Sequence, residues 1–84
     1  MNKKTILDLS FSKPAIYEIK VQGSLTESEA KRLGGLELNV HKNEAGKMIS
    51  TLKGKISDQS ALSGILNSLY DMHIMVLSVN ILKD

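Results

Sequence analysis

Residues 57–81 read SDQSALSGILNSLYDMHIMVLSVNI, and they join the pattern of an amphipathic helix to that of a strand. Ser57 and Asp58 are residue types that cap helix N-termini, so a helix is predicted over about 59–72. The stripe that would face a core at helical spacing comprises Leu62, Ile65, Leu66, Leu69 and His73. A strand is predicted to follow at once, with Met75, Leu77, Val79 and Ile81 alternating with Val76, Ser78 and Asn80.

Two further strands are predicted before this helix. Residues 36–41 and 48–56 both alternate between apolar and polar side chains, which is the period of a half-buried strand. The segment between them, 42–47, predicts a hairpin turn with Gly46 in a left-handed conformation. The inward face would comprise Leu36, Leu38 and Val40 from the first strand, and Ser50, Leu52, Gly54 and Ile56 from the second.

The first half of the chain repeats this layout. Residues 15–22 predict a strand with Tyr17, Ile19 and Val21 on its inward face, and Gly23 ends it. A short helix follows, which could begin in either of two capping boxes, one at residues 24–27 and the other at residues 26–29. Gly34-Gly35 would stop this helix.

The order strand, helix, strand, strand, helix, strand predicts an α+β fold of the ferredoxin-like, split β-α-β type. It would have one four-stranded antiparallel sheet with both helices on one face, because right-handed crossovers place them there. We expect one domain over residues 15–84. Residues 1–14 stand apart as an N-terminal arm, either mobile and loosely docked or a short edge strand that pairs with a partner chain.

Composition excludes several classes of function. The 84 residues contain no cysteine, which rules out disulfides and thiolate chemistry. The net charge is +2 and the basic residues are dispersed without interleaved aromatics, so we expect no nucleic-acid partner. The apolar run near the N-terminus is too short for a secretory signal, and no run could cross a membrane. A cytoplasmic location is therefore expected.

No catalytic, metal or cofactor site is predicted. Residues 21–23 match the V-Q-G of acylphosphatases, but Glu27 stands where that family has an anion-binding arginine. His41 and His73 are the only histidines, and no third metal ligand can be assigned to them. Glu18 and Glu37 lie on the open face, where no burial would raise a carboxyl pKa for acid–base work. We therefore expect no enzyme.

The region of the second helix resembles a group of small uncharacterised bacterial proteins. The shared features are a strand ending in L-x-G at residues 52–54, D-Q-x-A-L-x-G-[IL]-L at residues 58–66, and L-S-V at residues 77–79. The first strand and the G-G-L of residues 34–36 are also similar, so the resemblance covers roughly residues 16–80. It implies the domain bounds and the strand order, and no activity.

The chain departs from that group at three places. Many members have an aromatic residue in the first helix, where this chain has none. Many have proline after the strand glycine and histidine before the helix glycine, where this chain has Lys55 and Ser63. The missing histidine further weakens an enzymatic interpretation.

The first functional hypothesis is a protein-interaction or self-association module, with a homodimer as one form. Its basis is the open sheet face, on which two apolar residues stand among polar ones. The predicted interaction face comprises Lys20, Ile49, Thr51, Lys53, Val76 and Ser78.

The alternative hypothesis is a regulatory domain of the ACT-like sort that binds a small-molecule effector. Such domains share this strand order and bind effectors where domains pair. Gly23, Ser24 and Gly64 are the positions at which a ligand could approach backbone donors. Gly64 is notable because alanine would favour the helix by about 1 kcal/mol.

Overall fold

The predicted element order is confirmed. A computed structural model describes residues 14–83, so most of the predicted arm lies outside the described residues. The elements are β1 (Ala15–Gln22), α1 (Glu27–Arg32), β2 (Glu37–Lys42), β3 (Met48–Ile56), α2 (Gln59–Asp71) and β4 (Val76–Lys83).

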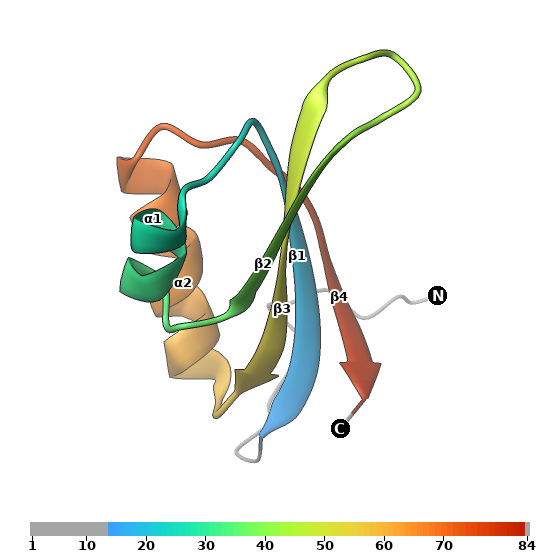
Figure 1. Cartoon of the computed structure of the whole chain (residues 1–84). Coiled ribbons are helices and arrows are strands. Elements are labelled where there is room, and N and C mark those ends of the chain that lie inside the picture. Colours follow the sequence, from blue (N-terminus) through green and yellow to red (C-terminus); the bar gives the residue numbers. More distant parts are fainter. Residues whose placement is uncertain (1–13, 84) are drawn as a thin grey trace.

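The four strands form one antiparallel sheet in the order β2-β3-β1-β4. Both helices cover the same face of this sheet, and no helix of the described residues covers the other face, which we call the open face (Figure 1). β1 lies in the interior of the sheet, with Ile19 opposite Leu52 of β3 on one side and Val79 of β4 on the other. The fold is therefore the predicted ferredoxin-like α+β layout.

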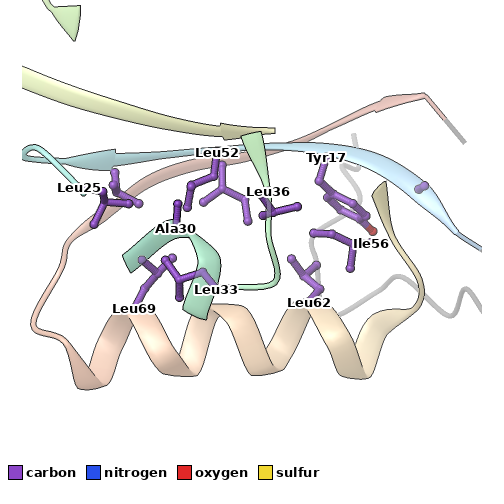
Figure 2. Packing of buried hydrophobic residues seen from close by; sticks show 12 residues of the cluster. Tyr17, Leu25, Ala30, Leu33, Leu36, Leu52, Ile56, Leu62 and Leu69 are labelled. Atoms are coloured by element: carbon purple, nitrogen blue, oxygen red, sulfur yellow. The ribbon is translucent and has the colours of Figure 1, made fainter. Parts of the chain in front are cut away.

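The core lies between the sheet and the two helices. Tyr17, Ile19 and Val21 are buried, as the alternation in β1 predicts. Figure 2 shows Tyr17 near Ile56 and Leu62 at one end of this layer, with Leu69 at the other end. Burial of the phenol raises the pKa of Tyr17, because the charged form would lose its hydration.

The second of the two possible capping boxes starts α1. The hydroxyl of Thr26 accepts a hydrogen bond from the backbone N–H of Glu29 at 3.1 Å. The carboxylate of Glu29 accepts one from the backbone N–H of Thr26 at 2.8 Å. These two bonds satisfy donors that a helix start leaves open, which matters for a helix of only six residues.

α2 ends before His73, which the sequence pattern had placed in the inward stripe. The backbone N–H of Ile74 bonds to the carbonyl of Leu69, and that of His73 bonds to the carbonyl of Tyr70. This is the Schellman arrangement, in which the residue after the C-cap takes a left-handed conformation. His73 occupies that position with a φ of 61° and is exposed, so its place in the stripe was wrong.

Replacing His73 by glycine is expected to raise the free energy of unfolding by about 0.5–1 kcal/mol. Glycine removes the steric cost of the left-handed backbone, although it also increases the freedom of the unfolded chain. His73→Ala keeps the Cβ atom and is expected to give no such gain. Urea denaturation of both variants measures this, and equal stabilities would contradict it.

β4 departs from simple alternation at two places. Its register against β1 shifts between Lys20 and Val21 and again between Ile16 and Tyr17, which marks β-bulges. The first shift leaves Val76 opposite Val21, where it packs against the core. The prediction that Val76 lies on the open face is therefore wrong, and Leu77 is 47% exposed rather than inward.

Candidate functional site

The open face of the sheet is polar. A depression of about 340 Å³ lies across β1, β2 and β3, and its lining comprises Glu18, Lys20, Glu37, Asn39, His41, Thr51 and Lys53. Lys53 is opposite both Glu18 and Glu37 in the register. Opposite charges on neighbouring strands stabilise the pairing of those strands, so the row Glu18, Lys53 and Glu37 has a structural explanation.

The six residues predicted as an interaction face do not form one exposed surface. Lys20, Thr51 and Lys53 share the polar depression, and Ser78 is opposite Lys20. Ile49 and Thr51 are only 7% and 9% exposed, because their strand, β3, lies between β2 and β1. Ile49 stands between Gln22 and His41, so one of the two apolar residues that motivated the hypothesis is already covered.

Gly23 and Ser24 form the turn after β1, and internal hydrogen bonds hold this turn. The hydroxyl of Ser50, which is fully buried, donates to the carbonyl of Gly23 at 2.6 Å. The same hydroxyl accepts from the backbone N–H of Leu25 at 2.9 Å. Gly23 has a φ of 104°, which favours glycine. The turn geometry thus explains Gly23 without a ligand.

Gly64 lies in the middle of α2, away from that turn. A Cβ atom added there would meet nothing within 4 Å, so neither close packing nor backbone approach requires glycine. It stands five positions after Gln59 at the helix start, a rise of about 7–8 Å. Gly64 therefore lies inside the helix and not at a helix start with free backbone donors, and effector binding at Gly23, Ser24 and Gly64 stays a prediction.

β4 offers a different surface. It is an edge strand in the part of the chain that the structure describes, so one side of its backbone has no neighbouring strand. No charged residue occurs from Val76 to Leu82. Proteins commonly protect such edges with charges or proline, and within residues 76–82 β4 has only its bulges.

An apolar hollow of about 450 Å³ opens between this edge strand and the C-terminal half of α2. Its lining comprises Leu66, Tyr70, Ile74, Met75, Val76 and Val79. Leu77, Ile81 and Leu82 of the same strand are also exposed. We call these nine residues the α2–β4 surface. Tyr70 is 80% exposed and Met75 is 61% exposed.

The clustering of exposed apolar residues distinguishes this surface from the rest of the described chain. Within residues 14–82, the large hydrophobic residues that the structure exposes number six, and all except Val40 belong to the α2–β4 surface. Isolated surface hydrophobics are normal, whereas a contiguous patch marks a contact site. The sequence contained one signal for it, the uncharged run after α2.

No group of three or more acidic, histidine or cysteine side chains that could hold a metal occurs among the described residues. The described helices are also too short or too polar to span a membrane. A family model for a domain of unknown function, DUF8691, matches residues 16–80. The chain belongs to this family. The DUF8691 domain takes in nearly all of β1 and most of β4, and it contains every buried hydrophobic residue of the core except Ala15.

No curated protein and no solved structure matches the chain. The DUF8691 match agrees with the bounds of the resemblance seen in the sequence, roughly residues 16–80. The detailed sequence pattern of that resemblance and its bacterial source stay predictions. Because the family model brings no activity, the function of the DUF8691 domain has to be argued from its surface.

Proposed function

We propose that this domain is a protein-interaction module and that its contact site is the α2–β4 surface. The observation that supports this most is the concentration of exposed apolar side chains beside an uncharged sheet edge. Burying apolar area contributes about 25 cal/mol per Å², so a partner that covers Tyr70 and Met75 gains binding energy there.

A polypeptide suits this surface better than a small molecule does. The edge of β4 presents backbone N–H and C=O groups, to which an extended segment of a partner can add as a further strand. The hollow beside it contains side chains of Leu66, Tyr70 and Val79 but no charged group that would orient a polar ligand. Backbone bonds would supply affinity, and the hollow would select apolar side chains.

Site-directed photo-crosslinking in the source cells tests the proposal. A benzoylphenylalanine at position 70 replaces one aromatic residue by another and is expected to give covalent adducts with protein. The same probe at Glu44, in the exposed hairpin turn, is the matched control and is expected to give none. Absence of adducts from position 70, or equal adducts from both positions, would refute the proposal.

A further inference from the structure

The seven uncharged residues of β4 have a chemical symmetry about their centre. Residues 76–82 read VLSVNIL, with Val79 in the middle. Ser78 and Asn80 are the two polar residues and flank Val79 at equal distance. Leu77 and Ile81 come next, and Val76 and Leu82 complete the segment with apolar side chains at both ends.

This symmetry favours an antiparallel pairing of the segment with its own copy. A two-fold axis at Val79 places Ser78 of each copy opposite Asn80 of the other, and Leu77 opposite Ile81. Polar residues then meet polar residues and apolar residues meet apolar ones. Moving the axis by one residue shortens the uncharged paired segment by two residues. A shift toward the C-terminus brings Lys83 into the pairing, and a shift the other way brings in the loop before Val76.

We propose that a second copy of this chain occupies the α2–β4 surface, through antiparallel β4–β4 pairing about Val79. The inference rests on the proposed function and names its partner. The two sheets would join into one of eight strands, with all four helices on the same face. Val79 also lines the apolar hollow, so the hollows of both copies meet at the axis and Tyr70 of each gains apolar cover.

Electrostatics favours β4 over the opposite edge for this contact. β2 contains Glu37, His41 and Lys42 and all of its residues except Leu38 are exposed. Pairing at β2 would require desolvation of those polar groups. Pairing at β4 brings no two charges of the same sign together within residues 76–82, although each chain has a net charge of +2.

Light scattering of the full chain over a concentration series tests the pairing. We expect a mass that approaches twice the 9.2 kDa of one chain. The variant Ser78→Lys/Asn80→Lys places like charges opposite each other twice and is expected to raise the dimer dissociation constant at least about tenfold.

The matched control, Ser78→Glu/Asn80→Lys, introduces as many charged groups but makes both cross-strand pairs attractive. It is expected to dimerise at least as well as the native chain, and Lys20 and Glu18 on β1 complement it. Equal dimerisation of the two double variants would overturn the proposal. So would a strict monomer, or a dimer that depends on residues 1–13 and not on β4.

Disulfide trapping gives a second, register-specific measurement, because the chain has no cysteine of its own. Val79→Cys places two thiols opposite each other at the axis, within the Cα separation that a disulfide allows. Asn80→Cys is displaced by two residues from its copy, beyond that separation. Rapid oxidation of the first and not the second is expected, and the reverse would overturn the register.

These outcomes separate the inference from the proposed function. A monomeric protein whose position-70 probe still crosslinks to a different protein refutes the self-pairing and leaves the interaction module standing. A dimer held through other residues, with no adduct from position 70, refutes both.

Discussion

Leu69→Ala is expected to lower the free energy of unfolding by about 2–5 kcal/mol, the range for removing a large side chain from a core. Leu69 is completely buried, and its side chain points from α2 toward the sheet (Figure 2). A small domain has only about 5–15 kcal/mol of stability, so this change removes a large part of it. Urea denaturation followed by circular dichroism measures the effect.

Two variants serve as controls for Leu69. Leu66 is only partly buried because it lines the apolar hollow, so Leu66→Ala is expected to cost less than Leu69→Ala. Lys20 lies on the open face, and Lys20→Ala is expected to change stability by less than about 0.5 kcal/mol. If Lys20→Ala were the most damaging of the three, the inward and outward faces of the sheet would be assigned backwards.

Ser50→Ala is expected to lower the free energy of unfolding by about 1–3 kcal/mol, although it removes only one oxygen atom. The hydroxyl of Ser50 holds both the carbonyl of Gly23 and the backbone N–H of Leu25. Without it, two backbone groups beside the core lose their partner, and unsatisfied buried groups are costly.

The control for this change is Ser78→Ala, a partly buried strand serine for which the structure gives no such pair of backbone bonds. We expect it to alter stability by less than about 0.5 kcal/mol. Thermal denaturation of the two alanine variants compares them under one condition. Equal melting temperatures would show that the Ser50 hydroxyl does not anchor the turn.

Most of the fold could be predicted because each strand and helix has a clean period and a recognisable start. The alternation in β1 placed Tyr17 inward, and the residue type at Asp58 marked the start of α2. For α1 the sequence left two capping boxes open, of which the structure shows the one at Thr26. Gly54, part of the L-x-G motif, is explained by packing, since a Cβ atom there would lie 2.8 Å from the Leu36 side chain.

The predictions were wrong for side chains whose exposure depends on neighbouring strands and not only on the alternation within their own strand. The bulges in β4 reversed the expected positions of Val76 and Leu77, and no sequence signal marks a bulge without glycine. The alternation in β2 predicts that Val40 faces inward, but its side chain is 37% exposed. Ile49 shows the opposite error. It was predicted to be exposed on the open face, but it is buried because its strand, β3, lies between two other strands.

The candidate contact site was missed for the same reason. Periodicity describes one strand at a time, whereas an edge exists only once the strand order is known. The α2–β4 surface joins the end of a helix to a strand whose outward side faces no other described strand. Its uncharged sequence was visible, but the sequence alone did not show that those residues would remain uncovered.

The interior position of β1 has a consequence for the order in which the molecule can be assembled. β1 is the first of the described strands to be synthesised, yet its two neighbours are β3 and β4. During translation, β1 therefore has no strand partner until residues 48–56 have been made, and its second side waits for residues 76–83. Such non-local pairing slows folding. The nascent chain thus carries the four buried hydrophobic residues of β1 without a complete sheet around them until the last described strand has been made.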